Sequence, residues 1–249
     1  MQFIDTHIHL QDFKSNCATD IINQAQKAGI KRLICVSSVA ADWEKVAEMA
    51  TKFAPFVVPA FGLHPWYVEE AEADWAQKLE EYLQAFPKAL IGECGLDKLK
   101  NPNFAKQAEV FAKQIDLAKK YARPLIIHAV KADEWLNDFW KKLSERFVFH
   151  SFTSSAELAQ KVIKNGGLLG FNFSLLRSKN KEKLLSALPA DKILLETDGP
   201  YQGPTKGEEV LPTMLPELLA EIAAIRGEDK EVLATRIYQN SEEFINFGK

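Results

Sequence analysis

Short hydrophobic runs alternate with longer amphipathic stretches along the whole chain. We predict eight β-strands, near residues 2–7, 31–36, 57–62, 89–94, 124–128, 147–150, 167–172 and 193–197. The amphipathic stretches have helical spacing and lie near 19–28, 41–53, 73–86, 104–121, 132–145, 155–165, 180–187, 213–226 and 230–246. Strands that each lead into a helix favour parallel pairing with right-handed crossovers. The pattern therefore predicts an α/β fold, a (β/α)8 TIM barrel, in a single domain over residues 1–249.

Length and composition agree with one barrel of this kind. The chain has 249 residues, of which 47% are hydrophobic, and such barrels typically have about 250 residues. No apolar run approaches the length of about 20 residues that crosses a bilayer, and no export signal precedes the first predicted strand. The three cysteines are odd in number and far apart, which favours reduced thiols. We expect a cytoplasmic protein with no membrane partner and no obligate protein partner.

All five histidines lie at or just past the end of a predicted strand. His7 and His9 are two positions apart in the first strand, so both point to the same face. Carboxylates occupy two further strand ends. The remaining polar residues at strand ends are His64, Glu93, His128, His150 and Asp198. Because the carboxyl ends of the strands in a parallel barrel share one rim, we expect these side chains to converge there.

A rim of imidazoles and carboxylates predicts a metal centre. A single histidine at a strand end is more often a hydrogen-bonded structural residue than a ligand. A whole cluster buried without a counter-ion would be very costly, because unpaired buried charges are strongly disfavoured. Histidine is the commonest metal ligand in proteins, and carboxylates complete its sites. The cluster therefore favours bound metal.

Six ligands suit two ions better than one, because a mononuclear site usually takes three or four protein ligands. One ion is assigned the ligands of the first and last strands, His7, His9 and Asp198. The other is assigned the ligands of the fifth and sixth strands, His128 and His150. Glu93 bridges the two. Two divalent ions, two carboxylates and a bridging hydroxide leave about one positive charge to meet an anionic substrate. Mg²⁺, Mn²⁺ and Zn²⁺ all remain candidates.

These residues lie in segments that resemble a known family. The segments are "FIDTHIHL", "FGLHP", "IGECGLD", "QAEVFAKQIDLAKKYARPLIIH", "FHSF", "LLGFNFS" and "LLETDGPY", which run from residue 3 to 201. They resemble the TatD family of metal-dependent hydrolases within the amidohydrolase-like barrels. The resemblance implies a divalent-metal hydrolase that cuts phosphodiester bonds in DNA. It implies the same six metal ligands, and it places His64 near the substrate phosphate.

The chain departs from the family pattern at two places. Val130 stands where family members often carry an arginine after the strand-five histidine, and Lys131 follows it. The sequence "PTKGEEVLP" replaces an Arg-Asn-x-Pro motif after the last strand. Both changes remove groups expected to touch a phosphate chain. They leave metal binding intact and leave the identity of the substrate open.

Replacement phosphate contacts must come from a local patch, because the net charge of −3 and the pI of about 6.0 exclude a global basic field. We predict substrate contacts from His64, Lys131 and Arg177. Further lysines expected on this face are Lys98, Lys100 and Lys206. Aromatic side chains near the rim, which could stack on bases, are Trp66, Tyr67, Phe152 and Tyr201. Loop lysines are mostly solvated, and Trp66 and Phe152 could instead pack the loops against the barrel.

We predict a two-metal phosphodiesterase. Asp198 and Glu93 are the predicted catalytic residues: Asp198 takes the proton of the attacking water, and Glu93 holds the metal pair together. A narrow barrel mouth favours a strand end, so we expect 3'-5' exonuclease action on single-stranded DNA. The alternative is hydrolysis of a small amide, lactone or ester at the same centre, and a panel of such compounds would distinguish it. A metal-stabilised, non-catalytic scaffold is a third hypothesis, which an inert Asp198→Asn substitution would favour.

Overall fold

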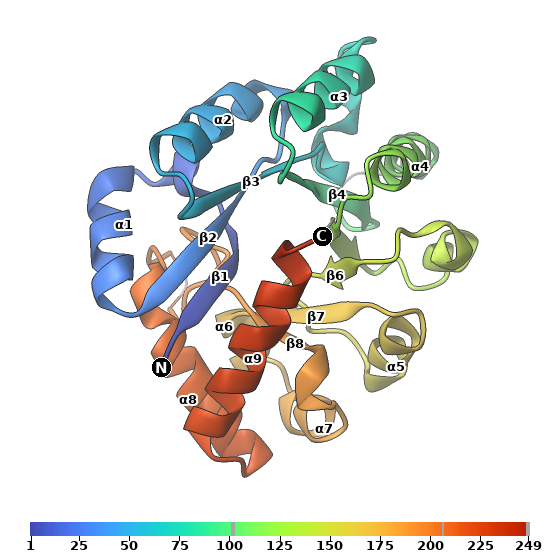
Figure 1. The fold of residues 1–249 in the computed structure, drawn as a ribbon. Coiled ribbons are helices and arrows are strands. Elements are labelled where there is room, and N and C mark those ends of the chain that lie inside the picture. Colours follow the sequence, from blue (N-terminus) through green and yellow to red (C-terminus); the bar gives the residue numbers. More distant parts are fainter. Residues whose placement is uncertain (101–102, 206, 248–249) are drawn as a thin grey trace.

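The computed structural model describes residues 1–100, 103–205 and 207–247, and Figure 1 shows their fold. Eight parallel strands lie side by side in the order in which they occur in the sequence. They are β1 (Phe3–Ile8), β2 (Ile30–Val36), β3 (Val57–Phe61), β4 (Leu90–Asp97), β5 (Leu125–Val130), β6 (Phe147–Phe149), β7 (Leu168–Phe171) and β8 (Ile193–Leu195). The predicted α/β fold and TIM-barrel architecture are confirmed, and every predicted strand overlaps an observed one.

Helices cover the barrel, most of them around its outside (Figure 1). They are α1 (Ala18–Lys27), α2 (Trp43–Lys52), α3 (Trp75–Ala85), α4 (Phe104–Lys120), α5 (Ala156–Lys164), α6 (Phe173–Leu176), α7 (Lys181–Ser186), α8 (Leu215–Arg226) and α9 (Lys230–Ile245). Short 3₁₀ helices, including Pro65–Glu70 after β3, link some of these elements. Among the described residues, no helix combines the length and apolarity needed to cross a membrane.

The strands are apolar on both faces, as buried parallel strands should be. Neighbouring apolar residues in the middle of a strand therefore belong to different apolar clusters. In β5, Ile126 packs inside the barrel, whereas Leu125 and Ile127 pack between the barrel and its helices. Cys94 of β4 belongs to the outer cluster, so its thiol faces away from its neighbour Glu93. The alternation decides which polar residues can enter the barrel interior.

One predicted helix is wrong. The stretch 132–145 forms two 3₁₀ helices, Trp135–Asp138 and Trp140–Lys142, instead of one amphipathic α-helix. Leu136, Phe139 and Leu143 are buried at the expected three- and four-residue intervals, so the hydrophobic spacing was present. Its tryptophans, asparagine, aspartates and phenylalanine are weak helix formers. Tight 3₁₀ turns bury the same side chains without requiring a continuous α-helix.

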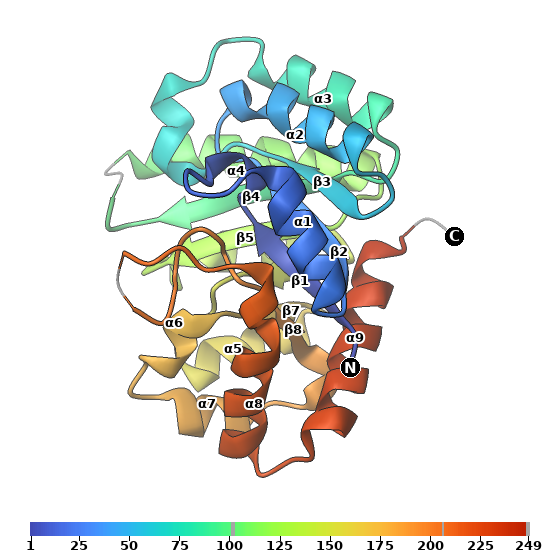
Figure 2. The same ribbon diagram turned by 90° about the vertical axis from the view of Figure 1, so that its left-hand side faces the viewer.

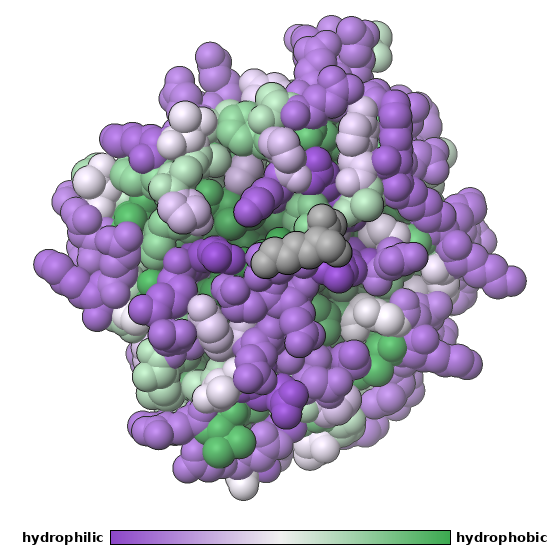
Figure 3. Space-filling model, in the orientation of Figure 1, coloured by the Kyte–Doolittle hydropathy of each residue, from purple (hydrophilic) through white to green (hydrophobic). Residues whose placement is uncertain are grey.

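The two ends of the barrel differ in chemistry. Helix α9 crosses the end where the strands begin, and its Phe244 and Ile245 join the apolar cluster inside the barrel. The outer surface of this end is mostly hydrophilic (Figure 3). The loops after β4 and β8 project from the opposite end (Figure 2). This second end is the rim at which the polar strand ends were expected to meet.

The barrel closes where β1 meets the end of β8. The backbone N–H of Asp198 donates to the carbonyl of His7 at 2.9 Å, and the N–H of His9 donates to the carbonyl of Gly199 at 2.7 Å. Deeper in the seam, the buried Asp5 carboxylate accepts hydrogen bonds from the N–H and the hydroxyl of Thr197. These bonds fix the relative positions of two polar strand ends, those of His7 and Asp198.

Candidate metal centre

Glu93 of β4 lies at the middle of the polar rim and is 3% exposed. Its two carboxylate oxygens face different groups of imidazoles. The nitrogens nearest Oε1 are His150 Nε2 at 2.6 Å, His128 Nδ1 at 2.9 Å and His64 Nε2 at 3.2 Å. The nitrogens nearest Oε2 are His7 Nε2 at 3.4 Å and His9 Nε2 at 3.7 Å. The five predicted histidines therefore gather around one carboxylate, divided between its two oxygens.

Asp198, just past β8, lies on the Oε2 side of Glu93. Its Oδ1 is 3.7 Å from His7 Nε2 and 3.5 Å from His9 Nε2. Asp198 has a φ of 57°, in the left-handed region, which non-glycine residues adopt uncommonly. The backbone bonds across the barrel seam hold it in this conformation beside β1. The structure thus brings all six predicted ligands to one place.

Two pairs of imidazole nitrogens lie within hydrogen-bond distance of each other. His7 Nε2 lies 3.1 Å from His9 Nε2, and His128 Nδ1 lies 3.2 Å from His150 Nε2. Two nitrogens bound to one tetrahedral zinc at about 2.0–2.1 Å would lie about 3.3–3.4 Å apart. Two protonated nitrogens at this distance would repel each other. The spacing of both pairs therefore suits nitrogens that share a cation.

The outward ring nitrogens of these histidines face hydrogen-bond acceptors. His9 Nδ1 is 3.0 Å from the carbonyl of Val36, and His128 Nε2 is 3.1 Å from Asp97 Oδ2. A neutral imidazole that donates from one nitrogen has a lone pair on the other. The nitrogens of His9 and His128 that face Glu93 therefore have lone pairs for a metal. Metal-binding histidines typically use such an acceptor to fix their tautomer.

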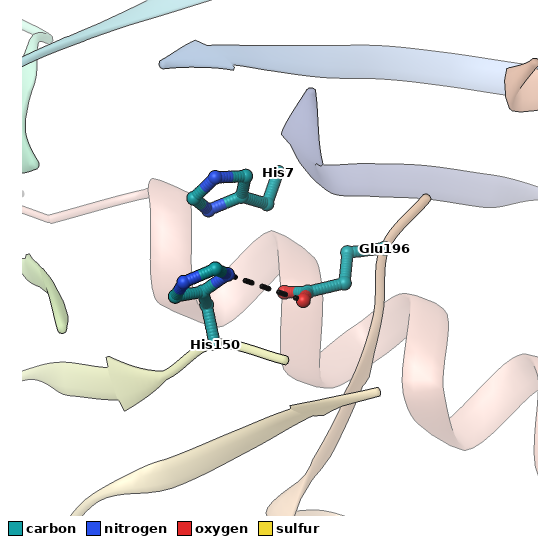
Figure 4. A group of neighbouring side chains, drawn as sticks. All are labelled: His7, His150 and Glu196. Carbon is teal, nitrogen blue, oxygen red and sulfur yellow. Dashed lines mark ion pairs between the residues drawn. The ribbon is translucent and has the colours of Figure 1, made fainter. Parts of the chain in front are cut away.

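Glu196, just past β8, provides an acceptor for His150 and lies beside His7 (Figure 4). His150 Nδ1 is 3.5 Å from Glu196 Oε1, and the His7 and His150 rings stack with centroids 4.1 Å apart. Within the described residues, His7 Nδ1, His150 Nδ1 and Glu196 Oε2 are buried without a hydrogen-bond partner. A proton on His150 Nδ1, facing Glu196, would leave the Nε2 of His150 free to bind metal.

His64 differs from the other four histidines. Its Nδ1 accepts a hydrogen bond from the backbone N–H of Trp66 at 3.1 Å. Burial lowers the pKa of His64 to about 4, so the ring is neutral near pH 7 and has its proton on Nε2. That Nε2–H points at Glu93 Oε1. Although ligand atoms of His64, Glu93 and His128 lie within 4.8 Å of one another, the tautomer makes His64 a hydrogen-bond donor instead of a metal ligand.

Negative charge is concentrated around these imidazoles. Four buried carboxylates contribute it, those of Glu93, Asp97, Glu196 and Asp198. Within the described part of the chain, their ion pairs are with histidines and none is with a lysine or arginine. Burial alone would lower the pKa of His150, but Glu93 and Glu196 outweigh burial and raise it well above its usual value. The same field that attracts a proton attracts a metal cation.

The centre opens into a cavity of about 1060 Å³. Lys131 lines this cavity as predicted and is exposed. Arg177 is not brought to it: its guanidinium donates to the carbonyl of Gly203 and to Gln202 Oε1 in the loop after β8. Lys206 lies outside the described residues. The cavity is also lined by Lys100 and by all four aromatic residues considered above, Trp66, Tyr67, Phe152 and Tyr201.

Comparison with known proteins agrees with this geometry. The family described as "TatD related DNase" matches residues 4–246. The chain belongs to the TatD related DNase family. It is 28% identical to "Deoxyribonuclease TATDN3" of Homo sapiens, over 96% of this chain and 92% of that protein. It is 26% identical to the "3'-5' ssDNA/RNA exonuclease TatD" of Erwinia tasmaniensis, over 91% of this chain and 92% of that protein.

A solved TatD structure has the same fold. The crystal structure of YJJV, a TatD homologue from Escherichia coli, is 27% identical to this chain and superimposes with a TM-score of 0.91, covering 99% of this chain and 98% of that one. A relative in Haemophilus influenzae, 27% identical over 97% of this chain and 98% of that protein, is named a metal-dependent hydrolase. The chain is accordingly a TatD-family hydrolase with histidine, glutamate and aspartate groups positioned to bind metal.

Two carboxylates of this TatD site, Asp97 and Glu196, were missed at the level of sequence. A usable signal was present, because residues two or four apart in a strand share a face. Asp97 is four positions after Glu93 in β4, and Glu196 is two positions before Asp198. From the sequence we predict a role only for the first carboxylate in "GECGLD" and the second in "ETD". Both missed residues contact the outer nitrogens of histidines.

Proposed function

We propose that this TatD-family protein hydrolyses phosphodiester bonds at the ends of single-stranded DNA, with two divalent ions held on opposite sides of Glu93. The observation that carries the proposal is the division of the histidines between the two Glu93 oxygens. His7 and His9 face Oε2, and His128 and His150 face Oε1. A carboxylate in this position suits a bridge between two ions. Asp198 completes the Oε2 side.

Counting formal charges supports two ions. Glu93, Asp97, Glu196 and Asp198 contribute four negative charges, and two divalent ions balance them. The four ligand histidines are neutral when they bind metal. One divalent ion would leave about two buried negative charges uncompensated, which is costly. The count also corrects an expectation: with Asp97 and Glu196 included, two divalent ions and a bridging hydroxide leave about one negative charge instead of one positive charge, so the centre itself does not attract an anionic substrate.

The protein side chains have separate chemical roles. When bound, divalent ions lower the pKa of a water molecule and neutralise charge on a phosphate group. Asp198 lines the cavity and stays ionised, because His9 and His7 outweigh the effect of burial and lower its pKa. We assign Asp198 as acceptor of the proton from the attacking water. His64 also lines the cavity, and its Nε2–H, which points at Glu93 Oε1, would be free to donate to a phosphoryl oxygen when Glu93 holds metal.

The DNA substrate and the 3'-5' direction are proposed from the relatives. The Erwinia tasmaniensis relative is named for 3'-5' exonuclease action on single-stranded DNA and RNA. Hydrolysis of a small amide, lactone or ester is less well supported, because Glu93, and not a lysine, occupies the bridging position on β4. We further propose a single domain over residues 1–249. A cytoplasmic location is supported by the three cysteines, all of which are free.

The test uses end-labelled oligodeoxynucleotides and purified protein with Mg²⁺, Mn²⁺ or Zn²⁺. We expect stepwise shortening of single strands from the 3' end and little cleavage of blunt duplexes. Glu93→Gln should abolish cleavage. Glu109→Gln changes an exposed glutamate paired with Lys106 and serves as the matched control. Absence of cleavage with every metal, or turnover of small amides or lactones alone, would reject the proposal.

A further inference from the structure

Asp97 connects the metal centre to the rim of the cavity. Its Oδ2 accepts a hydrogen bond from Trp66 Nε1–H at 2.6 Å and lies 3.1 Å from His128 Nε2. Its Oδ1 accepts hydrogen bonds from the backbone N–H groups of Leu99 at 2.7 Å and Lys100 at 3.1 Å. One buried carboxylate therefore positions a metal-binding imidazole, an indole and the loop that carries Lys100.

Trp66 is held in place yet remains accessible. It is 36% exposed, and its ring lies edge-on to His64 with centroids 4.7 Å apart. The ammonium group of Lys100 lies over the indole, 3.9 Å from the ring centroid. Both side chains line the cavity that contains Glu93. An aromatic ring and a cation thus lie together at the rim, and only the His64 side chain separates them from the metal centre.

An aromatic ring beside a cation suits the base and the phosphate of a single nucleotide. A nucleobase is planar and stacks on tryptophan, and a phosphate pairs with an ammonium group. The centre needs such help, because its own carboxylates balance two divalent ions. Lys100 covers one face of the indole in the absence of substrate, and a base that stacks there would displace the ammonium group toward the phosphate. A purely structural tryptophan would need neither an exposed face nor a neighbouring cation that lines the cavity.

We propose that Trp66 and Lys100 form a subsite for the nucleotide next to the scissile bond, in which the base stacks on the indole and Lys100 pairs with the phosphate. This inference rests on the proposed nuclease function. Asp97 acts as a positioning residue, because its hydrogen bonds hold the subsite at a fixed place relative to His128. Stacking at the rim thereby aligns the neighbouring phosphodiester with the metal centre.

The first experiment measures binding and turnover of a short single-stranded oligodeoxynucleotide. Intact substrate is compared with substrates that have one abasic nucleotide at successive positions near the 3' end. For the wild-type protein we expect one position at which loss of the base raises KM about tenfold, the range of a single stacking contact. Trp66→Ala should raise KM for intact DNA about tenfold and remove the sensitivity to the abasic position. Trp66→Phe should have a smaller effect.

Matched controls separate the subsite from general effects. Trp135→Ala changes a tryptophan that is 43% exposed and does not line the cavity. Lys100→Gln should weaken binding and lower the slope of log affinity against log salt by about one. Lys113→Gln, at an exposed lysine of α4 that does not line the cavity, should change neither. Equal KM values for wild type and Trp66→Ala on intact DNA would overturn the subsite.

The role of Asp97 is tested by metal affinity, measured calorimetrically without substrate. Asp97→Asn should weaken metal binding about 10- to 100-fold, as loss of a carboxylate behind a metal-binding histidine does, and should also raise KM for DNA. Circular dichroism checks that the variant is folded. For a variant that does not fold, Trp66→Phe, which keeps an aromatic ring but removes the hydrogen bond to Asp97, tests the link through KM. Unchanged metal affinity in folded Asp97→Asn would overturn the positioning role.

Failure of the subsite is distinguishable from failure of the nuclease function. Equilibrium binding of the oligonucleotide is measured by fluorescence anisotropy of a 5' label in Ca²⁺. Binding that depends on Trp66, without cleavage in any metal, rejects the proposed hydrolysis and retains the subsite. Cleavage with no dependence on Trp66 rejects the subsite alone. No binding by the wild-type protein rejects both.

Discussion

The two sides of Glu93 are built differently. On the Oε2 side, main-chain groups fix the imidazoles: His9 donates to the carbonyl of Val36, and backbone hydrogen bonds across the barrel seam place His7 beside Asp198. On the Oε1 side, side-chain carboxylates face the outer nitrogens of the imidazoles. Asp97 faces His128, and Glu196 faces His150.

This difference has consequences for function. Main-chain contacts are set by the fold and hardly respond to substitution, so the Oε2 side should be rigid. The side-chain carboxylates on the Oε1 side can change, and one of them also positions Trp66 at the rim. We infer that the Oε2 side keeps the geometry of the site fixed. The Oε1 side sets the metal affinity through its side-chain carboxylates and links the site to the rim where substrate binds. Four predictions test this comparison.

Removal of the metal ions should have the largest effect, because it empties both sides. Dialysis against a chelator should abolish hydrolysis and leave the buried carboxylates without compensation. Ligand binding at about 1,000 times the dissociation constant adds about 4 kcal/mol of stability, so we expect Tm to fall by roughly 8–16 °C for a chain of this size. Differential scanning calorimetry with and without metal measures the shift. An unchanged Tm would contradict metal binding at this site.

Glu93→Gln should affect both sides through one residue. Glutamine has about the same volume but cannot bridge two cations with a charged group. We expect metal affinity and kcat to fall by at least about a hundredfold, more than the 10- to 100-fold typical of residues behind the ligands. Calorimetric titration with Mn²⁺ and single-turnover kinetics measure the two effects. A variant that retains two ions of wild-type affinity would show that Glu93 is not the bridge.

Glu196→Gln should act mainly on the Oε1 side. It replaces the acceptor for His150 Nδ1 with a group that can donate as well as accept, so the tautomer is less well fixed. We expect the ion on the Oε1 side to lose about 10- to 100-fold in affinity while the ion on the Oε2 side is less affected. A stepwise titration distinguishes the two ions. Equal weakening of both would mean that Glu196 supports His7 as strongly as His150, and the proposed asymmetry would be lost.

Substitution of His64 should have the smallest effect on metal binding, because its tautomer makes it a donor. The pKa of His64 is about 4, below its ordinary value, so the ring gains a proton only as the pH falls toward 4 and is neutral above about pH 5. His64→Gln keeps an N–H donor and should retain more activity than His64→Ala. The profile of kcat/KM above pH 5 should have the same shape for wild type and His64→Gln. An acidic limb near pH 6.5 that disappears in the variant would contradict a neutral His64.

The sequence predicted the barrel well because each strand is a short apolar run and each run is bounded by a helical pattern. The stretch 132–145 shows where this reasoning fails: hydrophobic spacing was helical, but weak helix formers favoured two 3₁₀ turns. Periodicity reports which residues are buried. It does not report which hydrogen-bonding pattern the backbone adopts while burying them.

For the candidate site, the sequence predicted where the histidines lie but not how their rings are hydrogen-bonded. Histidines at strand ends were located because residue type and strand position coincide in the sequence, as at His128 and His150. The hydrogen-bonding states of the rings could not be predicted, because they depend on distant partners such as Val36 for His9. Arg177 was expected at the cavity, but its guanidinium is bonded to the loop after β8. Loop conformation decides such contacts, and local sequence does not encode it.

Anomalous diffraction from crystals grown with Mn²⁺ tests the central claim most directly. We expect two peaks per chain: one among His7, His9 and Asp198, and one between His128 and His150, with a Glu93 oxygen on each. His64 Nε2 should contact neither ion. A single peak, or a peak bound to His64 Nε2, would contradict the account.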